Sequence, residues 1–202
     1  MNLDALMKIE YGLYCLTVRK DDKDNGCIIN AVNQVTLTPC CLAIAVNKLN
    51  YTHDIIVDTK EFNLSVLTKK TPFSIFKNFG YQSGKTVNKF TNCDAAKSDN
   101  GICYLPQYAN SYFSCKVANI IDLGTHSLFI AEVTQAEILN DEPSLSYSYY
   151  LANIKEDLPV AKPATKAWRC KICGYIYEGD PLPADFICPL CKHGAIDFEK
   201  VE

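Results

Sequence analysis

Two closely spaced C-x-x-C pairs constrain the folding of this chain more than any other feature of its sequence. They are Cys170 with Cys173 and Cys188 with Cys191, and 14 residues separate the two pairs. Each pair can form a turn that points two thiolates at one place, so together they predict a tetrahedral four-sulfur site for zinc or a single iron. The segment 168–202 is too short to fold around an apolar core alone, and such a metal would stabilise it. A redox-active dithiol is the competing interpretation.

The composition changes ahead of this segment, between Ile154 and Ala167. The stretch holds Pro159 and Pro163, several lysines and alanines, and no aromatic residue. This composition is typical of a linker. We therefore predict one domain over residues 1–153, a linker over 154–167 and a small metal-stabilised domain over 168–202.

The remaining composition is that of an ordinary folded chain with reduced thiols. A net charge of -3 lacks the basic footprint of a nucleic-acid-binding protein. No apolar run is long enough for a membrane span, and the N-terminus lacks the pattern of a signal peptide. The odd total of 11 cysteines disfavours a disulfide framework. Seven cysteines lie outside the C-x-x-C pairs and are predicted to be buried apolar side chains in a reducing cytoplasm: Cys15, Cys27, Cys40, Cys41, Cys93, Cys103 and Cys115.

Residues 1–153 predict many short strands and few helices. We expect a hairpin turn at Asp24-Asn25-Gly26, a helix capped by Thr52, and a second helix that starts at Thr71-Pro72 and ends near Phe79. A further short helix is predicted over residues 4–9, and a loop-rich region over 80–110. Strands are predicted at 11–18, 27–32, 35–38, 41–46, 61–68, 111–123 and 127–139. The pattern indicates a mainly β fold, a β-barrel with peripheral helices.

Three polar clusters interrupt the predicted strands, over residues 30–36, 47–53 and 79–85. The second and third could bind an anion, because Asn, Lys, Ser and Thr side chains and the free amides of a helix N-terminus together hold phosphate. A capped helix and a flexible turn explain the same clusters without a ligand. No G-x-G-x-x-G motif follows a strand, so a Rossmann nucleotide site is not indicated.

Taken in order, the segments ALMKIEYGLYCLTV, NAVNQVTLTP, NKLNYTHD, FG-x-x-SGK with the later Lys89-Phe90, and GTHSLFIAEV resemble the flavin reductase family over residues 1–150. The resemblance implies an FMN-binding split β-barrel, usually a homodimer. It places His126 near flavin and nicotinamide as the candidate catalytic residue, with a surface turn histidine as the alternative. The chain departs from the family's usual residues at Thr125 and at Pro39-Cys40.

The same resemblance implies three groups of FMN-binding residues. The first group would line the isoalloxazine: Asn30, Ala31, Val32, Gln34, Val35 and Thr36. The second corresponds to the family's phosphate-side segment: Asn47, Lys48, Asn50, Thr52 and His53. The third belongs to the loop that closes over the ribityl chain and the phosphate: Ser83, Gly84 and Lys85.

The C-terminal segment resembles rubredoxin, an iron(Cys)4 one-electron carrier. The resemblance rests on C-x-x-C-G-Y, C-P-x-C and the surrounding aromatic residues Trp168, Tyr175, Tyr177, Phe186 and Phe198. The short spacer resembles the compact rubredoxin domain at the end of rubrerythrins. This implies that Cys170, Cys173, Cys188 and Cys191 bind iron, with a structural zinc ribbon as the alternative. Lys192 stands where rubredoxins usually have glycine.

A split barrel followed by rubredoxin resembles the high-molecular-weight rubredoxins of anaerobes. That resemblance implies an enzyme that oxidises NAD(P)H through FMN and passes single electrons to the iron centre. The onward acceptor would be a protein such as a flavodiiron O2 or NO reductase. Two alternatives stay open at this point. One is an electron carrier whose flavin is reduced by a separate reductase, and the other is a non-enzymatic barrel with a zinc ribbon.

Overall fold

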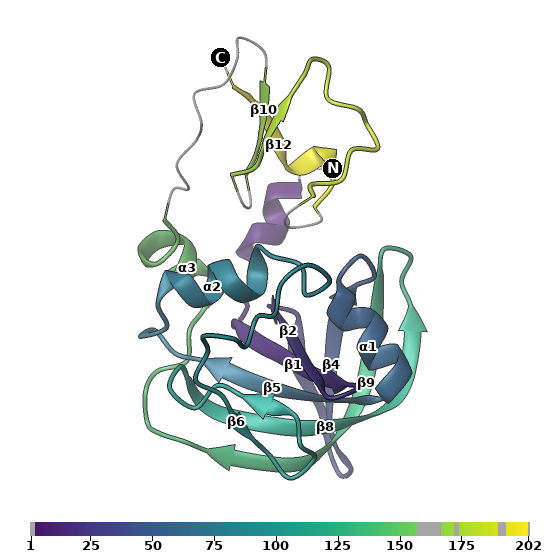
Figure 1. Cartoon of the computed structure of the whole chain (residues 1–202), viewed down its shortest axis with the longest axis vertical. Helices are drawn as coiled ribbons and strands as arrows, with labels where there is room; N and C mark the ends of the chain where they lie inside the picture. Colours follow the sequence, from purple (N-terminus) through teal and green to yellow (C-terminus); the bar gives the residue numbers. More distant parts are fainter. Residues whose placement is uncertain (1–2, 157–166, 172–173, 190–192, 202) are drawn as a thin grey trace.

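The computed structural model describes residues 3–156, 167–171, 174–189 and 193–201. Figure 1 shows a large β domain with a smaller β domain above it, and the chain passes from one to the other after helix α3. The predicted linker lies almost wholly outside the described residues. None of the described helices is long and apolar enough to cross a membrane.

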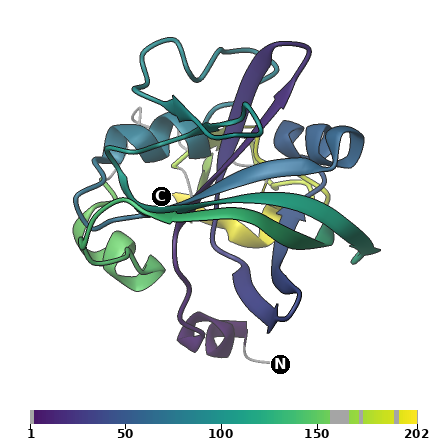
Figure 2. The same ribbon diagram turned by 90° about the horizontal axis from the view of Figure 1, so that it is seen from below.

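The large domain is built on one seven-stranded sheet in the order β2-β1-β5-β8-β9-β4-β3, in which all neighbours are antiparallel. Strands β2 and β3 are its two edges. Seen from below, the long strands β8 and β9 cross the whole domain (Figure 2). The bounds are β1 Tyr14–Lys20, β2 Lys23–Ile29, β3 Val32–Leu37, β4 Cys40–Asn47, β5 Glu61–Leu67, β8 Ala109–Asp122 and β9 His126–Ile138.

The sheet curls around its apolar face, because one buried core joins residues from strands that are far apart in the sheet order. Ile29 of β2, Leu64 of β5, Ile44 of β4 and Phe129 of β9 all belong to this core. Burial of such large side chains is the main force that holds the curled sheet. The mainly β fold predicted from the sequence is confirmed.

The predicted hairpin turn was wrong. The chain turns at Asp21 and Asp22, which adopt φ values of 48° and 60°, while Asn25 and Gly26 lie inside strand β2. A Cβ on Gly26 would lie 2.8 Å from the carbonyl oxygen of Leu16. The glycine is therefore required for a close approach between strands rather than for a turn.

Helix α1 (Tyr51–Thr59) also begins differently from the prediction. Asn50 is its N-cap, and the Asn50 side chain accepts a hydrogen bond from the backbone N–H of Thr52. Thr52 was predicted as the cap because it precedes the apolar residues. The better acceptor geometry of asparagine two residues earlier decides the start of the helix.

Two more helices pack on the large domain. Helix α2 (Phe73–Gly80) follows Pro72 without a side-chain cap, since the Thr71 hydroxyl donates to the Tyr108 carbonyl instead. Helix α3 (Tyr147–Asn153) is capped by Ser146 and was not predicted. Together they cover a second core. The remaining elements of this domain are η1 (Leu3–Lys8), β6 (Ala96–Lys97) and β7 (Cys103–Tyr104).

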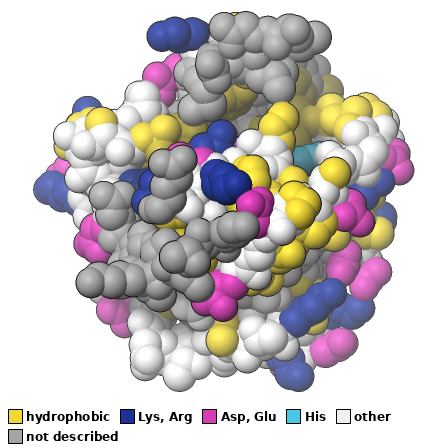
Figure 3. Space-filling model, turned by 90° about the horizontal axis from the view of Figure 1, so that it is seen from above, with side chains coloured by type: hydrophobic (Ala, Val, Ile, Leu, Met, Phe, Trp, Pro, Cys, Tyr) yellow, Lys and Arg dark blue, Asp and Glu magenta, His cyan; other side chains and the backbone are white. Residues whose placement is uncertain are grey.

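The small domain holds a three-stranded antiparallel sheet in the order β11-β10-β12. Its elements are β10 Ala167–Cys170, β11 Ile176–Glu178, η2 Ala195–Asp197 and β12 Phe198–Val201. On the face seen from above, acidic and basic side chains are interspersed (Figure 3). Hereafter this small domain, residues 167–201, is called the tail.

Candidate functional site

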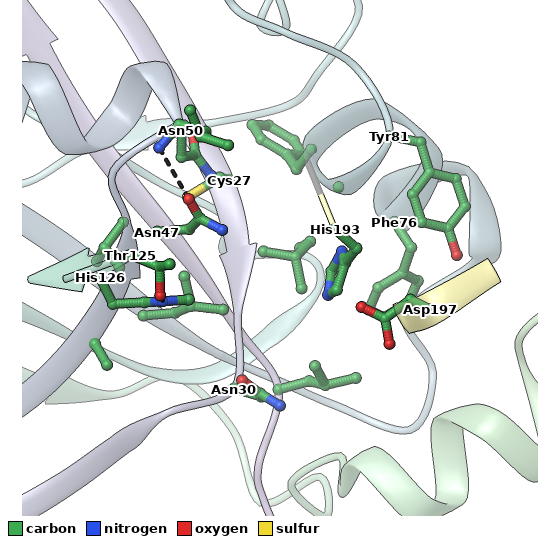
Figure 4. A pocket seen from close by; sticks show the side chains of 18 of the residues that line it. Cys27, Asn30, Asn47, Asn50, Phe76, Tyr81, Thr125, His126, His193 and Asp197 are labelled. Atoms are coloured by element: carbon green, nitrogen blue, oxygen red, sulfur yellow. Dashed lines mark hydrogen bonds between the residues drawn. The ribbon is translucent and has the colours of Figure 1, made fainter. Parts of the chain in front are cut away.

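A cavity of about 680 Å³ lies between the large domain and the tail (Figure 4). This volume falls in the range of cofactor and ligand sites. Most of its wall comes from the end of β2, the β4–α1 connection, helices α2 and α3, and the β8–β9 turn. The tail supplies the rest of the wall, through Ile187, His193, Gly194 and Asp197.

One end of the cavity is polar and includes the start of helix α1. Asn47 ends β4, and its backbone carbonyl accepts the N–H of Asn50 at 3.0 Å. The side chain of Asn47 accepts the N–H of Leu49 at 2.9 Å. These turns place the N-terminus of a nine-residue helix beside the cavity, where its partial positive charge favours an anion.

Lys48 lines the same end, and its ammonium is held by an ion pair. Its Nζ lies 2.6 Å from Asp122 Oδ1. The Lys48 ammonium and then the backbone N–H of Gly124 hold the pKa of Asp122 below its ordinary value. Asp122 therefore stays ionised and keeps Lys48 at the edge of the cavity.

His126 faces the cavity from the first position of β9, directly opposite Asn47 in the β4–β9 ladder. Its Nδ1 lies 2.9 Å from the hydroxyl of Thr125. Partial burial lowers the pKa of His126, and the neighbouring His193 and His53 lower it further. A neutral imidazole at pH 7 follows from these effects.

An aromatic wall faces the polar end, and the sequence analysis missed it. Its members come from α2, the residue after α2, and α3: Phe76, Phe79, Tyr81, Tyr147 and Tyr150. Aromatic faces suit a flat apolar ring system. The available signal was the clustering of aromatics in residues 73–81 and 147–150, which gave no indication that the two segments meet.

The structure brings together six of the predicted site residues on the cavity wall: Asn30, Asn47, Lys48, Asn50, Ser83 and His126. Thr52 and His53 lie behind this wall. The Thr52 hydroxyl accepts a hydrogen bond from Asn25, and His53 Nε2 lies 2.9 Å from the Ser127 hydroxyl with its ring edge-on to Phe129. Both residues support the wall from inside the core.

The predicted isoalloxazine segment mostly lies away from this cavity. Ala31 pairs through its carbonyl with the N–H of Ala45, and Val32 begins strand β3. The side chains of Gln34, Val35 and Thr36 lie along the edge strand β3, outside the cavity lining.

Gly84 and Lys85 also lie outside the lining. A Cβ on Gly84 would stand 1.9 Å from Asn25 Oδ1, so the loop packs directly on strand β2. Lys85 Nζ lies 3.8 Å from Asp54 Oδ2 and 5.4 Å from the centre of the Tyr51 ring. The loop thus braces the start of helix α1.

In the tail, Cys170 and Cys188 are buried in one core with Phe198. The N–H of Cys170 donates to the Tyr175 carbonyl, and that of Cys188 to the His193 carbonyl, each at 2.8 Å. Trp168, Tyr175, Tyr177 and Phe186 pack around the core. Cys173 and Cys191 lie outside the described residues. Two buried thiols under an aromatic cover fit a thiolate-bound iron or zinc.

The family model of the flavin reductase like domain matches residues 6–156, three quarters of the chain. The chain belongs to this flavin reductase-like family. The model of the rubrerythrin, rubredoxin-like domain matches residues 168–199. The flavin reductase-like domain implies a flavin, and the rubredoxin-like domain implies iron. The family assignments made from the sequence are confirmed.

Two relatives of this chain have names that belong to redox proteins. The high molecular weight rubredoxin of Moorella thermoacetica is 33% identical, and the match covers 100% of both chains. The ferric-chelate reductase (NAD(P)H) of Archaeoglobus fulgidus is 34% identical over 74% of this chain and 89% of its own. The chain is therefore an oxidoreductase that transfers electrons.

Solved structures support the fold alone. The NADH:FAD oxidoreductase of Streptomyces globisporus C-1027 superimposes with a TM-score of 0.66 at 20% identity, covering 72% of this chain and 86% of that one. A flavin reductase-like structure from Haemophilus somnus 129PT gives a TM-score of 0.65 at 22% identity, over 71% and 90% of the two chains.

Proposed function

We propose that this chain oxidises NAD(P)H through FMN bound in the cavity and passes the electrons singly to iron bound by four cysteines in the tail. The onward acceptor is a redox protein such as a flavodiiron O2 or NO reductase. One observation carries the proposal: the flavin reductase-like domain and the tail each supply part of the wall of a single cavity. A flavin bound in this cavity would lie beside the domain that carries the predicted iron ligands.

The polar end of the cavity supports a mononucleotide. The N-terminus of α1, Lys48 and Ser83 together offer amides, a cation and a hydroxyl to one phosphate. With the tail closing one side, the cavity of about 680 Å³ has room for FMN. The NAD(P)H in the name of the Archaeoglobus relative supports the choice of donor.

When bound, the flavin would accept the two electrons of a hydride and release them one at a time, as a four-thiolate iron requires. The residues of the chain have three tasks. The aromatic wall orients the ring and excludes water. The helix N-terminus holds the phosphate end. His126, neutral at pH 7, offers a hydrogen-bonding nitrogen to the nicotinamide without adding a charge.

The proposal includes a homodimer in a reducing cytoplasm. Edge strand β3 exposes Val35 and Leu37, with 53% and 76% of their surface accessible. An open edge with apolar side chains is suited to covering by a second copy. The seven cysteines of the large domain are all free thiols, which fits a reducing setting.

Anaerobic stopped-flow mixing with NADH, and separately with NADPH, tests the proposal. The expected result is bleaching of the flavin band followed by loss of the Fe(III) band. Flavin bleaching without iron reduction would show that the relay is wrong. Reduction by dithionite but by neither nucleotide would support the carrier that depends on a separate reductase. A colourless protein that contains zinc would support the non-enzymatic alternative.

A further inference from the structure

Tyr81 lies where the large domain meets the tail. It is the residue that follows helix α2, and its backbone N–H donates to the Lys77 carbonyl. Its ring packs against the core under α2 and α3, and it also packs against the cysteine-bearing core of the tail. Among the described hydrophobic residues, Tyr81 is the one that packs against both of these cores.

Tyr81 also lines the cavity, on the same side as Phe76 and Asp197 in Figure 4. One side chain therefore lines the proposed flavin site and packs against the core that contains the proposed iron ligands Cys170 and Cys188. A second connection joins the two parts nearby, because Lys155 Nζ donates to the Lys171 carbonyl at 2.9 Å. Lys171 directly follows Cys170, so this contact also reaches the predicted metal site.

The large domain holds Tyr81 in place through contacts of its own. The hydroxyls of Tyr81 and Tyr150 lie 2.8 Å apart and share a hydrogen bond. Tyr150 is only 6% exposed, and its burial, with this hydrogen bond, raises its pKa. The Tyr81 ring also meets Phe73 edge-on, with 5.9 Å between ring centres. The position of Tyr81 is thus set by α2 and α3.

We propose that Tyr81 is a positioning residue for electron transfer, because it seats the cysteine-bearing core of the tail against the cavity. The inference rests on the proposed function for its kinetics. Each transfer moves one electron from the reduced flavin to Fe(III), which becomes Fe(II), and no covalent bond forms or breaks. A one-electron acceptor must reoxidise the iron before the second electron follows, and the proton left on the flavin goes to solvent.

Three variants separate the ring of Tyr81 from its hydroxyl, and a fourth is a control. Tyr81→Ala removes the contact with the tail and should slow iron reduction at least about tenfold, since small displacements of reacting groups cost large factors. Tyr81→Phe and Tyr150→Phe break the same hydrogen bond from its two ends and should slow it by no more than about threefold. Tyr104→Ala removes a ring that stacks on Tyr112, away from the cavity, and controls for general damage.

A second measurement reports the docking of the tail without any turnover. Trp168 is the single tryptophan of the chain, and it packs against the tail core. In the full chain loaded with flavin and with zinc in place of iron, energy transfer to the flavin should shorten the Trp168 fluorescence lifetime. Tyr81→Ala should lengthen that lifetime, while Tyr104→Ala should leave it at the wild-type value.

The two measurements distinguish failure of the inference from failure of the proposed function. Equal iron reduction and equal Trp168 lifetimes in wild type and Tyr81→Ala would overturn the role of Tyr81 and leave the relay intact. If wild-type iron is never reduced, the relay fails, and the lifetimes alone decide whether Tyr81 seats the tail. Should Tyr81→Ala not fold, Tyr81→Leu keeps the apolar contact with α2 and serves the same comparison.

Discussion

At the scale of single residues, the site depends on which groups are charged. Lys48 and Asp122 form an exposed ion pair at the cavity edge, whereas the His126 ring faces the cavity interior. Burial removes water from the histidine and disfavours its charged form. The cavity therefore combines a polar end, made by the start of α1 and the Lys48–Asp122 ion pair, with an uncharged region at His126. We propose that the first holds the phosphate of the flavin and the second the nicotinamide.

His126→Asn tests the neutral histidine. We expect NADH-dependent flavin bleaching to slow by about tenfold, the contribution of one hydrogen bond. Because the pKa of His126 is lowered, the wild-type rate should not change through this group between pH 7 and pH 9. It should change only below about pH 6.5, where the imidazole begins to gain a proton. The pH profile of the single-turnover rate checks this, and identical rates in both proteins would remove His126 from the site.

At the scale of elements, the loop after α2 is locked to strand β2 by Gly84. The Asn25 side chain that Gly84 touches donates to Thr52 at 3.0 Å, so one contact links the loop, the strand and the start of α1. Any side chain at position 84 must push one of these three apart. The phosphate end of the cavity depends on all of them.

Gly84→Ala should therefore lower the free energy of unfolding by about 1–3 kcal/mol, the usual cost of overpacking, and weaken flavin binding. Urea unfolding and flavin titration of the apoprotein measure the two effects. Gly80→Ala is the matched control, because its new Cβ would meet Ile28 at an ordinary 3.6 Å. A Gly84→Ala protein as stable as Gly80→Ala would show that the loop can move freely.

Local signals predicted the elements well and their junctions poorly. The strand over 61–68 and the two long strands after residue 110 were read from β-branched and apolar runs, and all three are present. The Asp-Asn-Gly turn failed because Asn25 and Gly26 serve contacts with Thr52 and Leu16, which are distant in the sequence. Such tertiary demands leave no local pattern.

The candidate site divides in the same way. The predicted residues that reach the cavity, such as Asn50 and His126, sit at strand ends and helix starts, where the sequence marks a junction. The aromatic wall comes from two helices that meet only in the folded chain. In the sequence, nothing distinguishes Tyr81 and Tyr150 from ordinary core residues. Their hydroxyls come together only in the folded chain.

At the scale of the whole molecule, the cysteines divide between two kinds of stabilisation. Those of the tail bind metal in our proposal, and the metal supplies stability that the small apolar core of so short a segment cannot supply alone. We expect Cys170→Ser to lose iron and unfold the tail while the large domain keeps its fold and its flavin. Metal analysis, circular dichroism and Trp168 emission report this, with Cys93→Ser as the control. Retained iron in Cys170→Ser would contradict the assignment.

The buried thiols of the large domain stabilise it only while they keep their protons. Burial raises the pKa of Cys115 to about 12 and that of Cys103 to about 11. A thiol that stays protonated to a higher pH in the folded chain than in the unfolded chain contributes its full stability below about pH 9 and loses it as the pH rises. The fold should therefore weaken in alkali.

Cys115→Val isolates this effect, because valine fills a similar space without a proton to lose. Between pH 9 and pH 11 the unfolding free energy of the wild type should fall by about 2–3 kcal/mol more than that of the variant. Urea unfolding followed by circular dichroism at each pH measures the difference. Val117→Ala, a nearby apolar truncation, should lower stability by the same amount at every pH. A Cys115→Val curve parallel to the wild type would mean that this thiol ionises equally well in the folded chain.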